Sequence, residues 1–348
     1  MRKFFFVSLI IFSILVLLLI KKEKSINHKV IEKHEQLIGN QLLNEINNIT
    51  IPYSKQGFTL HLPKSNPKGT LIFLSGSSMD TTRTMDEFDI IKPALKNDIA
   101  VLFISTGKVI EFLFTDEDIQ IVDNIIGDAL ESSSLIDKPK ILAGMSLGGT
   151  MALRYSEFCI LDKSNYKIKP NALVICDAPL DMVRLWNEQE QAIKNNFHPN
   201  AVAEAEWVLY FLKKHLGGTP KEAMKNYINY SPFVYLDKNN TKIKIFKNLP
   251  IRMYHEPDIN WWIKNRAKDY NTINSIDLAG FYNNLNIMGN TEVELITSFK
   301  KRKDYEKGAS PHTWTIVNND KLIAWILRQV KKISLQDSDQ KKLLNSTK

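Results

Sequence analysis

The chain has 348 residues, of which 44% are apolar and 24% charged, and it contains 14 Gly, 13 Pro and two Cys. These values exclude a disordered chain and a collagen-like repeat, and they support one large core or two modest domains. Two cysteines are too few for a disulfide framework or a zinc ribbon, so the fold must be stabilised by burial.

The net charge of +8 is unevenly distributed along the chain. Residues 1–24 contain five Lys or Arg and one acid, which leaves 41 basic and 37 acidic residues in the other 324. No block of Lys or Arg is interleaved with aromatic residues, as proteins that bind nucleic-acid strands require. We therefore expect no nucleic acid among the partners.

An unbroken apolar run from Phe4 to Ile20 dominates the N-terminus. As a helix, these 17 residues would be about 25 Å long, close to the hydrocarbon thickness of a bilayer. A charged stretch (KKEK) follows at 21–24, where a cleaved signal would have small residues. Residues 1–24 are therefore predicted to be a signal anchor, a transmembrane helix, with a cleaved signal peptide as the alternative. Residues 25–54 would form a juxtamembrane segment, which could be helical.

Short apolar runs bounded by Gly and small polar residues alternate with amphipathic stretches in the body of the chain. Such runs are typical of strands that are buried on both faces of a parallel sheet. Strands are predicted at 70–74, 99–105, 140–143, 172–176, 249–255 and 292–298. Helices are predicted after a cap at Thr115 and at 150–161, 201–216 and 321–330. This alternation predicts an α/β, doubly wound fold with a mostly parallel sheet.

Residues 182–230 interrupt the alternation. They contain no convincing strand, but they contain helical runs such as Ala201–Leu216. A helical insertion between two strands of such a sheet is typical of a cap over a pocket. The alternative is a pair of additional packing helices.

The segment GMSLG at 144–148 fits the motif G-x-S-x-G. It stands between a predicted buried strand and a predicted helix, which is the context that the motif requires. So sharp a turn strains the backbone at the serine, and the positions two before and two after it must be nearly free of side chain. Gly144 and Gly148 meet that demand, and Gly149 lets the helix approach the sheet. The motif predicts that Ser146 is a nucleophile.

With this motif, the chain resembles the α/β-hydrolase family of serine hydrolases over roughly residues 55–330. Its Ser-Pro-Phe segment at 231–233 is similar to that of esterases and prolyl-oligopeptidase-like domains. The resemblance implies that residues 55–348 form an α/β-hydrolase domain with a helical cap at about 182–230.

A serine nucleophile needs a base, normally a histidine that a carboxylate orients. The order along the chain in α/β-hydrolases is serine, acid, histidine. His312 follows the last predicted strand in a turn that enters the final helix, where family members carry the base. Asp258 follows the strand at 249–255 and is the predicted acid. Two alternatives stay open, because Glu256 lies two residues earlier and Asp177 ends the preceding strand.

The resemblance also implies an oxyanion hole made of two backbone N–H groups. One belongs to the residue after the nucleophile, here Leu147, and the other to the loop after an earlier strand. Ser77 is the predicted donor in that loop, with Ser78 next, although a plain Gly-Ser turn is the alternative.

The sequence contains no H-E-x-x-H, no paired cysteines and no P-loop. We therefore expect neither a metal nor another cofactor. Cys159 and Cys176 are each flanked by apolar residues, and this position favours buried thiols over catalytic ones.

These predictions together describe a serine hydrolase that cleaves an ester or related acyl bond through an acyl-enzyme, on a triad of Ser146, Asp258 and His312. Its partner would be a small-molecule acyl substrate. The alternatives are a serine peptidase or acyltransferase on the same triad, and a non-catalytic binding module. We expect a membrane-anchored protein with its hydrolase domain outside the cytoplasm, or a secreted one if the signal is cleaved.

Overall fold

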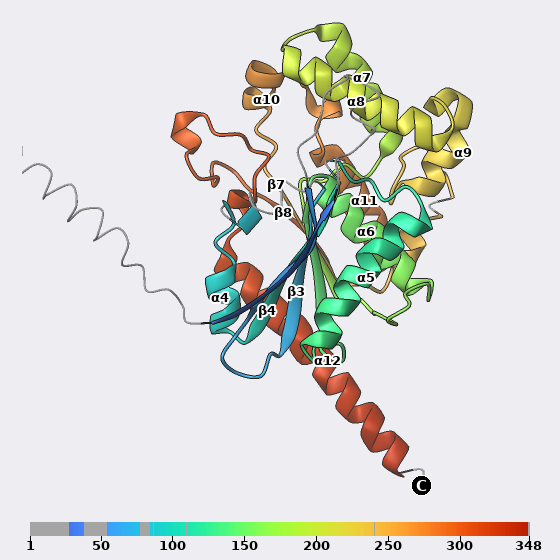
Figure 1. Cartoon of the computed structure of the whole chain (residues 1–348). Coiled ribbons are helices and arrows are strands. Elements are labelled where there is room, and N and C mark those ends of the chain that lie inside the picture. Colours follow the sequence, from blue (N-terminus) through green and yellow to red (C-terminus); the bar gives the residue numbers. More distant parts are fainter. Residues whose placement is uncertain are drawn as a thin grey trace, which may run out of the picture.

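The computed structural model describes residues 28–37, 54–76, 84–85, 87–108, 110–239 and 241–346, and among these it describes the backbone alone at 36–37, 54 and 336–346. Within these ranges the chain forms an eight-stranded sheet covered by helices (Figure 1). The predicted anchor at 1–24 lies outside the described residues, as does Ser77. Along the described part of the chain, no helix is both long and apolar enough to span a bilayer.

The strand order of the sheet is β1-β2-β4-β3-β5-β6-β7-β8. The strands are β1 (Lys29–Leu37), β2 (Ser54–Leu62), β3 (Gly69–Leu74), β4 (Ile99–Thr106), β5 (Lys140–Met145), β6 (Ala172–Cys176), β7 (Ile251–His255) and β8 (Val293–Thr297). Strands β3 to β8 pair in parallel, whereas β1 and β2 are antiparallel additions at one edge. The six predicted strands and the α/β fold class are confirmed. Strands β3, β4, β6 and β7 are fully buried, and such parallel strands need apolar side chains on both faces.

Helices cover both faces of the sheet and give the domain three layers (Figure 1). One face packs on α5 (Asp116–Ser132), α6 (Leu147–Ile160) and α11 (Ser275–Ile287). The other packs on α4 (Ile91–Lys96) and α12 (Asn319–Ser346). Thr115 caps α5 as predicted, since its hydroxyl accepts from the N–H of Asp118 at 3.2 Å.

The edge strand β1 corrects the prediction of a juxtamembrane helix within residues 25–54. All nine residues of β1 pair with β2, which was also not predicted as a strand. Gly57 allows this pairing, because an added Cβ there would lie 2.0 Å from the carbonyl oxygen of Lys33. An edge strand is held mainly by backbone hydrogen bonds, so its sequence can stay polar and carries a weak strand signal.

Three helices fill the insertion between β6 and β7: α7 (Met182–Asn195), α8 (Pro199–Leu216) and α9 (Pro220–Tyr230). They lie together at one end of the sheet (Figure 1) and form an apolar cluster of their own. Phe112, from the segment before α5, belongs to this cluster, and Leu147, at the start of α6, packs against it. The insertion therefore contacts the sheet domain directly beside Ser146.

A buried carboxylate fastens the start of the insertion to the sheet domain. Asp277, on α11, accepts hydrogen bonds from the backbone N–H of Leu180 at 2.8 Å and of Asp181 at 3.1 Å. It also accepts from Nε of Arg184 at 2.7 Å. Burial raises the pKa of Asp277 to about 6, although Arg184 opposes that rise. Because removing one partner of a buried ion pair costs about 3–5 kcal/mol, this contact fixes where α7 begins.

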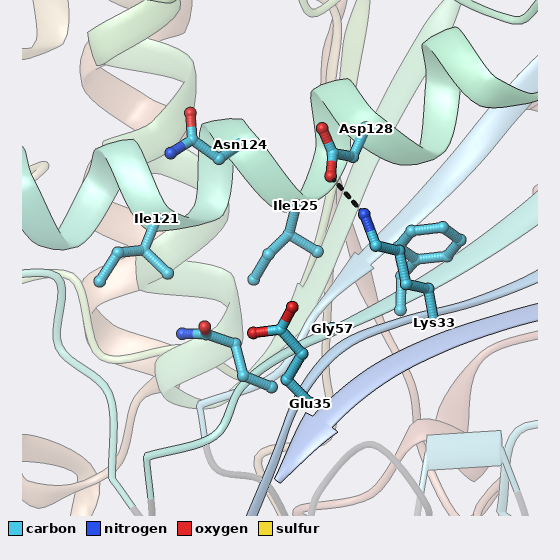
Figure 2. A pocket seen from close by; sticks show the side chains of 9 residues that line it. Lys33, Glu35, Gly57, Ile121, Asn124, Ile125 and Asp128 are labelled. Atoms are coloured by element: carbon cyan, nitrogen blue, oxygen red, sulfur yellow. Dashed lines mark hydrogen bonds and ion pairs between the residues drawn. The ribbon is translucent and has the colours of Figure 1, made fainter. Parts of the chain in front are cut away.

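A groove of about 210 Å³ lies at the β1 edge of the sheet (Figure 2). It is lined by Lys33, Glu35, Gln56, Gly57, Phe58, Ile121, Asn124, Ile125 and Asp128. An ion pair of 2.8 Å between Lys33 and Asp128 crosses it (Figure 2). Three strands separate β1 from β5, which leads to Ser146, so the groove is remote from the predicted nucleophile.

Candidate active site

Ser146 stands at a strained turn between β5 and α6. Its backbone angles are φ 55° and ψ −134°, a conformation that residues other than glycine rarely adopt. An added Cβ on Gly144 would lie 2.0 Å from the carbonyl oxygen of Gly148, and one on Gly148 would lie 2.3 Å from that of Leu74. Both glycines are therefore required by close backbone approaches, and the predicted strand–turn–helix context of the motif is confirmed.

The acid that contacts the histidine is Asp177, at the end of β6. Its Oδ2 lies 2.6 Å from Nδ1 of His312, and its side chain is only 6% exposed. The backbone of Asp177 is fixed from two sides, because its N–H donates to Tyr254 O at 2.9 Å and its carbonyl accepts from Nδ2 of Asn274 at 2.9 Å. A carboxylate on Nδ1 directs Nε2, the other ring nitrogen, toward a reacting group.

Ser146 and this pair lie at the same edge of the sheet. Met145 and Cys176 are partners in the pairing of β5 with β6, so Ser146 and Asp177 are the next residues along neighbouring strands. The N–H of Ser146 donates to the carbonyl of Cys176 at 3.0 Å. Between these described side chains no hydrogen bond joins Ser146 Oγ to His312, a contact that often forms only when substrate binds.

The charge state of His312 is governed by opposing effects. Burial lowers the pKa of the imidazole, but the hydrogen bond and the negative charge of Asp177 raise it, and the net effect is a pKa above the ordinary 6.5. Two more distant charges act on the same ring: Lys268 lowers the pKa and Glu204 raises it. The carboxylate that raises the pKa also stabilises the imidazolium that forms when a histidine acts as a base.

Asp258 does not contact the histidine, and its assignment as the orienting acid is wrong. Its carboxylate accepts from the N–H of Trp261 at 3.2 Å, as the cap of α10 (Ile259–Arg266), and lies 2.8 Å from Nη2 of Arg302. Glu256, one of the two alternatives, is also bonded to Arg302. The arginine therefore binds both carboxylates that follow β7. Asp177, the other alternative, lies beside His312.

The candidate oxyanion donors begin with Leu147. As the first residue of α6, its N–H has no acceptor within the helix and can bind a ligand atom. Gly76, in the loop after β3, packs against it, since an added Cβ there would lie 2.6 Å from Cβ of Leu147. The described start of the loop that should supply the second donor thus lies beside the first. The predicted donor in it, Ser77, falls outside the described residues.

Metal-binding clusters are absent from the part of the chain that the structure describes. Among those residues, no three His, Cys, Asp or Glu side chains lie close enough together to hold a metal ion. Cys159 and Cys176 are buried, free thiols, as predicted. Burial raises the pKa of Cys159 to about 12, so that thiol stays protonated and unreactive.

Sequence reasoning missed two residues that support the site, Arg302 and Asn274. Arg302 binds the two carboxylates that compete with Asp177 for the role of acid, and Asn274 holds the backbone of Asp177. Asn274 lies 97 positions from Asp177 in the sequence. No local pattern marks either residue, because each acts through a tertiary contact.

Comparison with known proteins identifies the fold. No family model matches the chain, and no curated protein matches it. Among solved structures, an acylaminoacyl peptidase of Pyrococcus horikoshii aligns with a TM-score of 0.54 at 15% identity, covering 90% of this chain and 43% of that one. A bifunctional GH43-CE protein of Bacteroides eggerthii aligns with a TM-score of 0.51 at 16% identity, covering 78% and 36%.

Carboxyl esterase 2 of the fungus Tuber melanosporum aligns with a TM-score of 0.51 at 12% identity, covering 89% of both chains. This chain spans less than half the length of the peptidase and of the bifunctional protein, whereas it matches nearly the whole esterase. At these identities the similarity establishes the fold alone. That fold is the α/β-hydrolase fold, as the resemblance implied.

Proposed function

We propose that this protein is a serine hydrolase that cleaves an ester or a related acyl bond through an acyl-enzyme. The observation that carries the proposal is the 2.6 Å contact between Asp177 Oδ2 and His312 Nδ1, at the sheet edge where Ser146 stands on its strained turn. The three side chains follow the order serine, acid, histidine along the chain. Each belongs to a different segment, so their meeting at one edge is a property of the fold.

In the proposed mechanism, Oγ of Ser146 attacks the acyl carbonyl while Nε2 of His312 takes the hydroxyl proton. The resulting imidazolium is stabilised by Asp177, and the oxyanion by the N–H of Leu147 with a second donor from the loop after β3. His312 then gives its proton to the leaving alkoxide, and the acyl group stays on the serine. Water repeats the sequence, with His312 as base, and releases the carboxylic acid.

The helical insertion lies beside Ser146, and from its apolar character we expect an apolar acyl group in the substrate. Its cluster includes Met182 and Trp186 of α7, and Leu147 packs against it beside the proposed oxyanion hole. Helices α7 to α9 would thus act as the cap over the acyl pocket. The nearly complete match to an esterase of similar length supports an ester over an amide as substrate.

We expect the purified full chain to hydrolyse p-nitrophenyl esters and to leave aminoacyl p-nitroanilides nearly untouched. Alkoxide leaving groups need less help from a general acid than amines do, and an apolar cap favours an acyl chain over a peptide. Turnover of esters of graded chain length beside aminoacyl anilides checks this. Cleavage of the anilides alone would assign a serine peptidase, and turnover of neither with no serine labelling would assign a non-catalytic binding protein.

We also propose that residues 1–24 anchor the protein in a membrane, with the hydrolase domain outside the cytoplasm. Support comes from the apolar run of 17 residues and from the charged stretch in place of a signal cleavage site. The full-length protein should then stay in the membrane pellet after carbonate washing and dissolve in detergent. A soluble form lacking about the first 25 residues would instead show a cleaved signal peptide.

A further inference from the structure

The loop that carries His312 is tied together by a buried arginine. The side chain of Arg302 is 1% exposed, and its guanidinium meets three acceptors. Nε donates to the carbonyl of Ala309 at 2.6 Å, Nη2 to Oδ2 of Asp258 at 2.8 Å, and Nη1 to Oε1 of Glu256. Ala309 is three residues before His312, so the arginine holds the backbone that leads to the proposed base.

Both carboxylates come from the segment directly after β7, and that segment makes further contacts with the same loop. Oε2 of Glu256 accepts from the N–H of Lys301 at 3.1 Å. Nε1 of Trp261, in α10, donates to the carbonyl of Gly308 at 2.8 Å. The middle of the His312 loop is therefore fastened to the end of β7 at several points, and the guanidinium lies at their centre.

Separate contacts hold the end of the loop. Oγ of Ser298 donates to the carbonyl of Ile316 at 3.1 Å, and the thiol of Cys176 lies 3.8 Å from the carbonyl of Thr313. These bonds fix the chain on the far side of His312, toward α12. On the near side, the contact of Arg302 with the carbonyl of Ala309 is the corresponding one.

We propose that Arg302 is a positioning residue, which sets the distance of His312 from Asp177 and Ser146 by joining Glu256 and Asp258 to the carbonyl of Ala309. The proposal rests on the proposed function only for the role of His312 as base. A planar guanidinium has five N–H groups in a fixed fork and can serve all three acceptors at once, which a lysine ammonium cannot do in the same geometry.

The effect of Arg302 on His312 is expected to be geometric and not one of charge. The charged groups that act on the imidazole are Asp177 directly after β6, Glu204 of α8 and Lys268 after α10. An Arg302→Lys change keeps the positive charge, so it leaves these electrostatic effects in place. A displaced loop, however, lengthens the bond to Asp177, and misplacing a catalytic group by about 1 Å can cost about 100-fold in rate.

The test compares three full-length proteins: wild type, Arg302→Lys and Arg252→Lys. Arg252, on β7, is a matched control, because its side chain is 9% exposed and lies 3.5 Å from the carboxylate of Glu294 on β8. The measurements are the pKa of His312, from NMR of ring-labelled histidine assigned with His312→Gln, the rate of fluorophosphonate labelling, and kcat and KM on a p-nitrophenyl ester.

Arg302→Lys should slow labelling and lower kcat by about 10–100-fold with KM little changed, and it should lower the pKa of His312. Arg252→Lys should change none of these, even if both variants melt at lower temperature. A pKa and a labelling rate in Arg302→Lys equal to those of Arg252→Lys would overturn the proposal.

An inactive wild type and an unfolded variant would have separate meanings. If the wild type is neither labelled nor active, the proposed function fails, but the comparison of the His312 pKa values still decides whether Arg302 positions the ring. If Arg302→Lys does not fold, Asp258→Ala takes its place, because alanine removes one of the three acceptors of Arg302. A lower pKa of His312 in that variant supports the proposal, and an unchanged one overturns it.

Discussion

Replacing Ser146 with alanine is expected to abolish covalent fluorophosphonate labelling and to lower kcat on any substrate ester by about 10⁶-fold, the cost of losing the nucleophile in a serine hydrolase. The loss is so large because the acyl-enzyme cannot form, and the base then has no hydroxyl to deprotonate. Alanine should be accommodated, since the strain at φ 55° is imposed by the turn and is already present with serine. Melting temperature and labelling of the purified full chain check both points.

Ser156→Ala is the matched control for this change. Ser156 lies on the same helix, α6, and its hydroxyl is buried without a hydrogen-bond partner, so the substitution removes no bond. This variant should be labelled at the wild-type rate. Labelling of Ser146→Ala at another serine would show that the nucleophile lies elsewhere, and the proposed mechanism would be wrong.

The central sheet could be predicted because burial on both faces leaves a continuous apolar signal. The run from Ala172 to Cys176, for example, is fully buried and has no polar side chain. The strands β1 and β2 were not predicted, because neither is a continuous apolar run. β1 (KVIEKHEQL) is mostly exposed, and what holds it is the backbone ladder to β2 and the close approach at Gly57. The sequence of either segment alone does not indicate that the two distant segments pair.

The places of Ser146 and His312 in the fold could be predicted from local sequence, whereas the carboxylate that contacts the histidine could not. Ser146 is marked by the glycines around it, and His312 by its place after the last strand. The acid is ambiguous because Asp177 and Asp258 follow adjacent parallel strands at the same sheet edge. Arg302 decides between them by binding Asp258, from 44 positions further along the chain.

Asp177→Asn is expected to lower kcat by about 10⁴-fold, the cost of losing the carboxylate that holds the histidine tautomer. The amide is nearly isosteric, so substrate affinity should change little. Its side chain can still reach Nδ1, but as a donor it favours the tautomer with the proton on Nε2, which cannot accept the proton of Ser146. Asp258→Asn should cost far less, about ten-fold, because that carboxylate is only one of three acceptors that hold Arg302.

The pH dependence separates the two variants further. Catalysis requires neutral His312, so kcat/KM should rise with pH, with a midpoint above 6.5 in the wild type because Asp177 raises the pKa of the imidazole. In Asp177→Asn the carboxylate is gone while burial, which lowers the pKa, remains. The residual activity should therefore have its midpoint at a distinctly lower pH, whereas Asp258→Asn should move the midpoint only slightly. A larger loss and a larger shift in Asp258→Asn than in Asp177→Asn would mean that the 2.6 Å contact is not the one used in catalysis.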